Sequence, residues 1–375
     1  AMGQPVVSAD DAQALMSTSK SDKKMSKAAE LLKAWEIDPL DLIKYQKLGE
    51  GGQATVFRGK WKGVDVAIKQ ARMKFQEVGG RKAEQELESM NHAVRRESRA
   101  LAGVRHPNVV RFFGVSFKPT PIMVMAFAPA GTLDDALSDN KFQSPAEVVR
   151  LLAGIARGME AVHVHMIIHL DLKPENVLIG PGDVPWITDF GLSTSARMTS
   201  MSQSSAGGRG TLPFKAPELF SYQAVISQAV DVYAFAILAW CVVSGEQPYS
   251  QMDNAATRLP TAVDEGVRPT LASGDDWRDL TTGTIAKLVE SCWDGEATNR
   301  PTFIGADGIV EKLDKMESAM TKGSDEDAQV TAIQRLIASQ NDAEAAQAYA
   351  TKIEAVRYEA TESEAKELAE EQEGA

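Results

Sequence analysis

The stretch HLDLKPEN, residues 169–176, is the most specific signal in this chain of 375 residues. It combines a carboxylate, Asp171, with a cation two residues later, Lys173, and an amide five residues later, Asn176. Asp189-Phe190-Gly191 begins eighteen residues beyond Asp171. Phosphoryl transfer needs these groups: a carboxylate near the attacking hydroxyl, oxygen ligands for Mg²⁺ and cations along the phosphates.

The segments on either side of this stretch carry matching groups. Gly49-Glu50-Gly51-Gly52-Gln53-Ala54-Thr55-Val56 is a glycine-rich turn, and glycine lets backbone amides approach phosphate because it has no Cβ. Thirteen residues after Val56 an apolar strand ends at Lys69, and Glu97 lies 28 residues further on. Taken singly, these are a common turn, a surface lysine and an exposed helix carboxylate. With Ala216-Pro217-Glu218 they complete an ordered series that chance does not explain.

The apolar pattern predicts a first part that is rich in strands. Apolar residues alternate between 42 and 70 around glycine turns, which is typical of short strands. Residues 81–102 are charged with apolar positions on one face, so we expect a helix there. Two more strands are expected at Val109–Val115 and Ile122–Phe127.

The second part is predicted to be mostly helical. Ser144-Pro145-Ala146-Glu147 has the order of a helix start, with Ser as the cap, Pro first and Glu third. Short apolar runs predict hairpin pieces near 166–170, 177–179 and 186–188. Further helices are expected near 230–244, 280–292 and 302–317, and over the Ala- and Glu-rich residues 325–373.

Together these motifs resemble those of eukaryotic-type protein kinases over roughly residues 40–318. Trp35-Glu36-Ile37-Asp38 resembles the lead-in of the tyrosine-kinase-like group, whose members mostly phosphorylate Ser and Thr. Lys173-Pro174 and Gly210-Thr211 resemble the serine/threonine-specific pattern. The resemblance implies a serine/threonine protein kinase that uses ATP with Mg²⁺, or with Mn²⁺ in its place. It would phosphorylate a protein substrate and also its own activation segment.

The resemblance also implies the α+β, bilobal protein kinase fold, with a small β-rich N-lobe and a larger helical C-lobe. We expect a flexible lead-in over 1–34 and a kinase domain over 35–318. The N-lobe would span 35–127 and the C-lobe 128–318, followed by an acidic helical tail over 319–375.

The family's roles are carried over to the matching positions of this chain. Lys69 would bind the α- and β-phosphates and pair with Glu97. Asp171 would accept or orient the substrate hydroxyl proton, and Lys173 would steady the transferred phosphate. The residues expected to bind Mg²⁺ are Asn176 and Asp189. The residues expected around the nucleotide are Gly49, Gly51, Gly52, Ala54, Val56, Ala67, Lys69, Met125, Ala126, Phe127, Ala128 and Leu178.

Other residues match structural positions of the family. Asp231 would anchor the catalytic loop from below, and Arg300 would form an ion pair with Glu218. The stacked apolar spine that links the lobes would consist of Leu101, Phe112, His169 and Phe190.

The chain departs from the family pattern at three positions. Ala54 replaces the third glycine of the loop and adds one methyl group, which should tune nucleotide affinity. Ala126 stands where Glu is common, but adenine pairs with backbone groups there. Leu170 stands where many kinases have an Arg that receives a phosphate on the activation segment, and leucine cannot do so. We therefore expect activity that does not require loop phosphorylation through that contact.

The expected activation segment, residues 189–218, is dense in hydroxyl groups. Two interpretations remain open: a flexible polar loop, or a site of autophosphorylation. In the second case the alternative phosphate partners would be Arg95, Arg96 or Arg99.

Charge and composition limit the classes of partner. The net charge is −12, and residues 324–375 alone carry 13 acidic and 4 basic side chains. The remaining body is nearly neutral, which argues against a broad nucleic-acid surface. The longest apolar run, Val232–Val243, is too short to span a bilayer, so no membrane partner is expected. Self-association or regulatory docking through the acidic tail stays open, beside a merely solubilising role.

Cysteine usage gives the expected compartment. Cys241 and Cys292 lie in apolar stretches, which indicates reduced, buried thiols and a cytoplasmic protein.

Two other functions compete with the active protein kinase. A pseudokinase scaffold would bind nucleotide and partners without turnover; the intact set of charged motif residues argues against it, while Ala54 and Leu170 leave room for it. A metabolite kinase is disfavoured by the complete segment that ends at Ala216-Pro217-Glu218, because that segment builds a platform for a polypeptide.

Overall fold

The computed structural model describes residues 32–51, 54–72, 81–195, 210–221, 226–271 and 277–321. The chain divides into two compact units, and nearly all of these residues belong to the unit Val7–Ala319, which is described by itself. The expected tail helix, most of the expected lead-in, Gly52 and the hydroxyl-rich residues 196–209 lie outside the described residues. Within the described part, no helix combines the length and apolarity needed to cross a bilayer.

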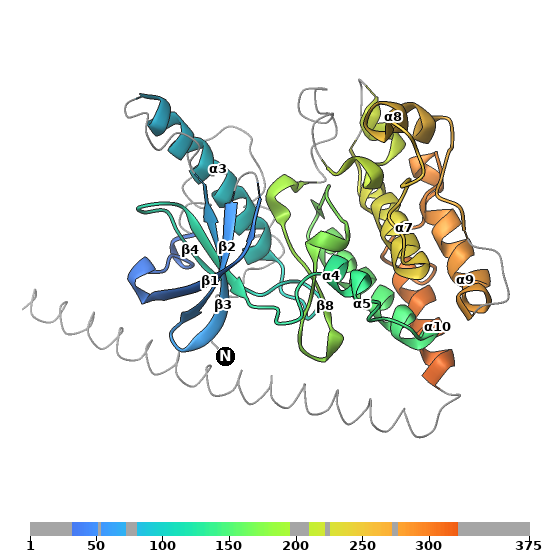
Figure 1. The fold of residues 1–375 in the computed structure, drawn as a ribbon, viewed down its shortest axis with the longest axis horizontal. Helices are drawn as coiled ribbons and strands as arrows, with labels where there is room; N and C mark the ends of the chain where they lie inside the picture. Colours follow the sequence, from blue (N-terminus) through green and yellow to red (C-terminus); the bar gives the residue numbers. More distant parts are fainter. Residues whose placement is uncertain are drawn as a thin grey trace, which may run out of the picture. The chain divides into compact units, whose positions relative to one another are not determined.

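The first half of this unit is an antiparallel sheet of five strands in the order β1-β2-β3-β5-β4 (Figure 1). Its strands are β1 (Leu42–Glu50), β2 (Ala54–Trp61), β3 (Val64–Ala71), β4 (Phe112–Ser116) and β5 (Ile122–Ala126). The register sets Val56 opposite Lys69 and Ala67 opposite Met125. Because alternate residues of a strand share a face, these four side chains lie on the same side of the sheet.

One long helix, α3 (Arg81–Gly103), contacts strands β4 and β5 of this sheet. Its buried residues include Val94, Glu97, Ser98 and Leu101. This spacing of three and four residues forms one face of a helix, so the helix predicted over 81–102 is confirmed. Glu97 is on the buried face, which brings a carboxylate into the interior.

A short segment before β1 completes the sheet edge at β4. Ile37 donates its N–H to the carbonyl of Val115 at 3.0 Å, and Val115 donates to the carbonyl of Trp35 at 2.9 Å. Trp35 is only 3% exposed, and its ring centroid lies 5.1 Å from that of Phe112. The segment Leu32–Ile37 therefore covers an edge that would otherwise present unpaired backbone groups.

The second half of the unit is mainly helical, as predicted. Its helices are α4 (Leu133–Ser138), α5 (Pro145–Val164), α7 (Ala229–Ser244), α8 (Ala255–Asp264), α9 (Trp277–Cys292) and α10 (Ile309–Thr321). Ser144 caps α5 and accepts from the N–H of Glu147, whose side chain bonds back to the N–H of Ser144, as the helix-start pattern predicts. Helix α7 is buried along nearly its whole length and contacts α5 and α9.

Two small two-stranded sheets follow α5 in the chain. They pair β6 (Ile167–Ile168) with β9 (Thr194–Ser195), and β7 (Val177–Ile179) with β8 (Pro185–Ile187). A β-rich N-lobe and a helical C-lobe confirm the predicted α+β, bilobal fold. The domain boundaries stay predictions.

Several predicted elements were wrong in detail. The strand expected at Val109–Val115 begins only at Phe112, because Val110 donates to the carbonyl of Ile187 and thereby joins hairpin β7/β8 instead. The helix expected from residue 302 begins at Ile309, after Gly305 at φ 100°. Helices α4 and α8 were missed, the first because it spans only six residues and the second because it contains Pro260.

Candidate active site

A half-buried lysine joins three separate elements at the centre of the site. The Nζ of Lys69, on β3, lies 2.7 Å from Oε1 of Glu97 on α3. The same Nζ lies 2.9 Å from Oδ1 of Asp189, which precedes a 3₁₀ turn, Phe190–Leu192. These partners are 28 and 120 residues away in sequence. The pairing of Lys69 with Glu97 is thus formed as predicted, and Asp189 is added to it.

The charges of this cluster shift one another's pKa values. Burial alone would lower the pKa of Lys69, but the carboxylates of Glu97 and Asp189 outweigh it and raise that pKa. Burial raises the pKa of Glu97, and the ammonium opposes this only in part. Burial would also raise the pKa of Asp189, yet the charge of Lys69 prevails and lowers it. One cation thus faces two carboxylates, which leaves the cluster attractive to a further cation.

The second cluster is built on Asp171 in the loop after β6. Its Oδ1 accepts the N–H of Thr211 at 2.9 Å and the Thr211 hydroxyl at 2.8 Å. Its Oδ2 accepts from Nδ2 of Asn176 at 2.9 Å. The Nζ of Lys173 donates to the Thr211 hydroxyl at 2.7 Å and lies 3.8 Å from Oδ2 of Asp171. The structure therefore brings Asp171, Lys173 and Asn176 together, as expected, and adds Thr211.

Asp231, on α7, holds this loop from beneath. Its Oδ2 accepts from the N–H of His169 at 2.8 Å, and its Oδ1 accepts from the N–H of Leu170 at 2.9 Å. The Nε2 of His163 lies 2.8 Å from Oδ2. Leu170 takes φ 69°, and a Cβ on Gly210 would lie 2.8 Å from the Leu170 carbonyl oxygen. Only glycine fits at 210, which keeps Thr211 next to Asp171.

Asn176 and Asp189 lie at the same end of hairpin β7/β8. The register pairs Val177 with Ile187, and Thr188 then donates its N–H to the carbonyl of Asn176 at 3.0 Å. The amide N–H groups of Asn176 serve the preceding loop, so its Oδ1 accepts no hydrogen bond from a described residue. The Oδ1 of Asp189 accepts from Lys69 at 2.9 Å and from the N–H of Gly191 at 3.4 Å.

The side-chain oxygens of Asn176 and Asp189 suit a hard cation. Mg²⁺ is bound by oxygen, commonly through one or two carboxylates completed by phosphates and water. No group of three or more His, Cys, Asp or Glu side chains that would hold a metal by itself lies among the described residues. A cation here would therefore complete its shell with water or a phosphate-bearing ligand.

The expected nucleotide residues frame one face of the sheet. Val56, Ala67 and Met125 share the face of Lys69, and Gly49 pairs opposite Val56 across the β1–β2 turn. In that turn the N–H of Gly51 donates to the carbonyl of Ala54 at 2.9 Å.

Residues 126–128, the hinge segment between the lobes where adenine is expected to pair with the backbone, begin at the last residue of β5. Ala126 ends β5, and its N–H donates to the carbonyl of Arg111 at 2.8 Å. Phe127 follows it, with the guanidinium of Arg58 4.8 Å from its ring centroid, and Ala128 is buried. Leu178 is on β7, where it forms a bridge with Thr132.

The structural pairs expected from the sequence are also in place. Arg300 bonds both carboxylate oxygens of Glu218, at 2.7 and 2.8 Å. The four expected spine residues, Leu101, Phe112, His169 and Phe190, are all buried. The rings of His169 and Phe190 have centroids 4.8 Å apart, in edge-to-face geometry.

Two of the three arginines considered as phosphate partners, Arg95 and Arg96, have other contacts. Arg96 donates to the carbonyl of Gly191, near the start of the expected activation segment. The guanidinium of Arg95 lies 3.9 Å from the ring centroid of Phe117. Most of the hydroxyl groups expected as phosphosites lie outside the described residues, so autophosphorylation stays a prediction.

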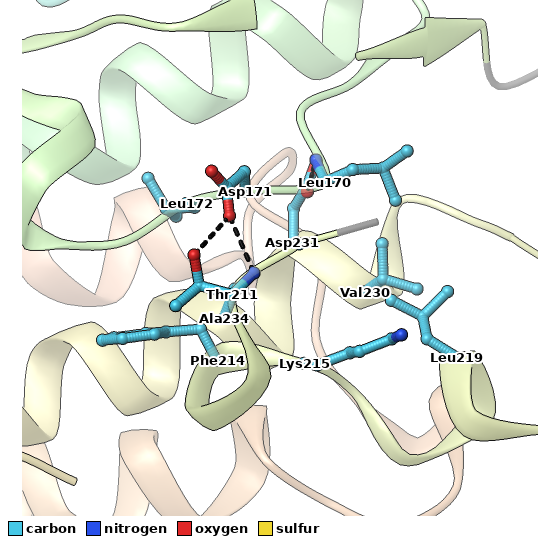
Figure 2. Close-up of a pocket in the computed structure, with 11 residues that line it drawn as sticks. Leu170, Asp171, Leu172, Thr211, Phe214, Lys215, Leu219, Val230, Asp231 and Ala234 are labelled. Carbon is cyan, nitrogen blue, oxygen red and sulfur yellow. Dashed lines mark hydrogen bonds between the residues drawn. The ribbon is translucent and has the colours of Figure 1, made fainter. Parts of the chain in front are cut away.

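A small pocket lies beside Asp171 (Figure 2). Its lining comprises Leu170, Asp171, Leu172, Gly210, Thr211, Phe214, Lys215, Leu219, Val230, Asp231 and Ala234. Lys215 is 5% exposed, which sequence reasoning missed. A lysine beside Ala216-Pro217-Glu218 gives no signal of burial, since lysines are mostly exposed.

Comparison with known proteins identifies relatives of most of this unit. The family model described as protein tyrosine and serine/threonine kinase matches residues 42–311. Mitogen-activated protein kinase kinase kinase 13-B of Xenopus laevis is 32% identical over 270 residues, which are 72% of this chain and 25% of that protein. Mitogen-activated protein kinase kinase kinase 12 of Rattus norvegicus is 31% identical over 271 residues, 72% of this chain and 27% of that protein. The chain thus matches only about a quarter of the length of these relatives.

Proposed function

This chain belongs to the protein tyrosine and serine/threonine kinase family, and from that premise we propose that it is an active serine/threonine protein kinase. It transfers the γ-phosphate of ATP to a hydroxyl group of a protein. The observation that carries the proposal is the double contact of Lys69, at 2.7 Å to Glu97 and 2.9 Å to Asp189. Protein kinases need the strand lysine paired with the helix glutamate for turnover, and here that pair is assembled.

The N-lobe residues hold and orient the nucleotide. The ammonium of Lys69 is fixed by two carboxylates, so it meets the α- and β-phosphates without reorganising. Gly49, Gly51 and Ala54 bring backbone N–H groups over the phosphates. Val56, Ala67 and Met125 offer an apolar surface to the base, beside hinge residues 126–128 and Leu178.

The C-lobe residues position the acceptor hydroxyl. Asp171 accepts or orients its proton, and Lys173 stabilises the charge of the phosphate in transfer. Thr211 bonds both side chains and holds them in one arrangement. Asn176 and Asp189 would hold Mg²⁺, which neutralises charge on the phosphates when it is bound.

A protein substrate is proposed from two observations. The ordered stretch Gly210–Glu218 lies against the catalytic loop, where a polypeptide can be held beside Asp171. The names of the relatives describe them as kinases in a series that acts on other kinases. The hydroxyl of Thr211 at Asp171 and Lys173 supports serine and threonine as acceptors, in line with the motif resemblance.

The test is phosphate transfer from Mg-ATP to the protein itself and to a generic basic protein. Asp171→Asn should lower the transfer rate about a thousandfold, since a positioned general base contributes 10²–10⁴-fold. Asp183→Asn, at an exposed carboxylate, is the matched control and should leave the rate unchanged. Mass spectrometry of the products should find phosphoserine and phosphothreonine.

Each alternative has its own outcome. Nucleotide binding without transfer, by protein that is folded, would contradict an active kinase and favour the scaffold. Phosphotyrosine as the sole product would contradict the serine/threonine assignment.

We also propose that loop phosphorylation through residue 170 is not required for activity. Leu170 is 6% exposed and lines the apolar side of the pocket, so it offers no donor to a phosphate. Phosphatase-treated protein should keep its transfer rate within about twofold of untreated protein, a difference of less than ~0.5 kcal/mol in barrier. Loss of all activity after phosphatase treatment would contradict this.

A further inference from the structure

Arg58 connects β2, the strand that leaves the glycine-rich turn, to the hinge segment 126–128. Its guanidinium carbon lies 4.8 Å from the ring centroid of Phe127. In the sheet, β3 lies between β2 and β5, so β2 has no hydrogen bonds to the strand that leads into the hinge. The side chain of Arg58 therefore joins two parts of the expected nucleotide site that the sheet does not pair directly.

The strand register places Arg58 on the face of the sheet that is expected to hold the base. Arg58 is directly opposite Ala67, and Ala67 is directly opposite Met125. Residues opposite one another in an antiparallel pair share a face, and so do alternate residues of one strand, here Val56 and Arg58. Arg58 thus lies at one end of a row of side chains that crosses three strands.

Two further features describe the surroundings of this guanidinium. Its Nη2 lies 3.6 Å from Oδ2 of Asp65 on β3, which holds the group from the side of the neighbouring strand. Its Nε is shielded from solvent and has no hydrogen-bond partner among the described residues. A cation that has lost part of its hydration gains more from an aromatic face, so the ring of Phe127 offsets part of that loss.

The hinge has few backbone contacts of its own at this point. The N–H of Ala126 donates to the carbonyl of Arg111 at 2.8 Å, and the carbonyl of Ala128 accepts from the N–H of Gly131 at 3.3 Å. Phe127 lies between these two hydrogen bonds. A contact that holds its ring therefore limits the rotation of the backbone where adenine is expected to pair.

Building on the proposed kinase function, we propose that Arg58 is a positioning residue for ATP. By holding the ring of Phe127, it keeps the hinge backbone in the arrangement that pairs with the base. A segment that is already ordered loses less conformational freedom when the ligand binds, which increases affinity. The effect acts on the base, so it should be the same for ATP and for adenosine. Direct attraction between the guanidinium and the phosphates would act on ATP alone.

The experiment measures the Kd of Mg-ATP and of adenosine for the full chain by calorimetry, which also reports the fraction of binding-competent protein. Arg58→Met keeps the length of the side chain and removes its charge. The Kd of both ligands should rise about fivefold, the size expected of a cation–π contact at a partly exposed site. The KM for ATP should rise by a similar factor, with kcat within about twofold of the wild type.

Two further variants separate the contact from a general effect of substitution. Arg58→Lys retains a cation over the ring, so its Kd values should stay within about twofold of the wild type. Arg81→Met, at an exposed arginine of α3, is the matched control and should leave both Kd values unchanged.

A double-mutant cycle tests whether Arg58 acts through Phe127. Phe127→Leu removes the aromatic face and should weaken both ligands by about as much as Arg58→Met. The protein with both changes should bind no more than about twofold more weakly than either single variant, because residues in contact have non-additive effects. Fully multiplicative losses would overturn the inference.

The inference and the proposed function fail in different ways. Unchanged Kd values in Arg58→Met overturn the inference, and so does a loss for ATP without a loss for adenosine. Either result, with phosphate transfer present, leaves the kinase in place. Wild-type protein that binds both ligands but transfers no phosphate contradicts the proposed function alone. Wild-type protein that is folded and binds neither ligand overturns both.

Discussion

Two buried carboxylates, Glu97 in the N-lobe and Asp231 in the C-lobe, are satisfied in opposite ways. Glu97 is 6% exposed, and its bonded partner is the ammonium of Lys69, which is shared with Asp189. Asp231 is fully buried, and it accepts from two backbone N–H groups of the catalytic loop and contacts an imidazole.

The difference separates an adjustable contact from a fixed one. The donors around Asp231 belong to one loop and one neighbouring helix, so these hydrogen bonds form whenever the C-lobe is folded. The ammonium that bonds to Glu97 comes from β3 and is shared with Asp189, so the three groups meet only when α3 is correctly placed. Loss of the contacts of Asp231 should affect stability, whereas loss of the contact between Glu97 and Lys69 should affect turnover.

Asp231→Asn should have the largest effect on stability. An amide has one acceptor oxygen, so at least one buried N–H loses its partner, at about 1–3 kcal/mol for each. We expect the free energy of unfolding to fall by roughly 2–4 kcal/mol, measured by urea unfolding. Asp183→Asn, at an exposed carboxylate, should change it by less than about 0.5 kcal/mol. Equal effects of the two changes would refute the anchoring role.

Glu97→Gln should have a small effect on stability and a large effect on the rate of phosphate transfer. The amide oxygen still accepts from Lys69, so stability should fall by only about 1 kcal/mol. The rate of phosphate transfer should fall about a hundredfold, because the lysine is no longer held by charge. Glu88→Gln, at an exposed residue of the same helix, is the control for both measurements. If Glu97→Gln unfolded the protein as readily as Asp231→Asn, the contrast between the two sites would disappear.

The buried thiols of Cys241 and Cys292 should give the smallest effect on stability, and their behaviour reports on the C-lobe alone. Burial raises the pKa of Cys292 to about 12, and it also raises the pKa of Cys241. Above pH 9 the unfolded chain loses these protons while the folded protein keeps them, so stability declines as the pH rises. Between pH 8 and pH 10 this amounts to about 1.4 kcal/mol per thiol.

Cys292→Ala should therefore lose about 1.4 kcal/mol less than the wild type between these pH values, as measured by urea unfolding. An identical decline in both proteins would contradict the raised pKa. In the native state both thiols should resist alkylation. Asp231→Asn should speed their reaction and Glu97→Gln should not, since both cysteines lie in C-lobe helices.

The sequence identified the charged groups of the site because their spacing is fixed by chemistry. Lys69 and Glu97, and Asp171 and Asn176, are in contact as the motifs predict. The further groups that complete each cluster were harder to predict from the sequence. Thr211 bonds to Asp171 across 40 residues, and that contact depends on the positive φ of Gly210, which no local pattern reveals.

Elements at the ends of loops were the least predictable part of the fold. Residues 109–111 have the composition of a strand, yet Val110 bonds to Ile187 in the other lobe. Tertiary contact overrides local preference there. The burial of Lys215 could not be predicted for the same reason, because it depends on which residues surround the side chain in space. Gly52 and the acidic tail, outside the described residues, stay predictions.

The segment Leu32–Ile37 has a practical consequence for preparing shorter versions of the protein. The family match begins at residue 42, which invites truncation there. Such a fragment would lose Trp35, uncover the ring of Phe112 and leave the N–H of Val115 without its carbonyl partner. An exposed sheet edge of this kind recruits other chains, so the shortened protein should self-associate where one starting at residue 32 does not.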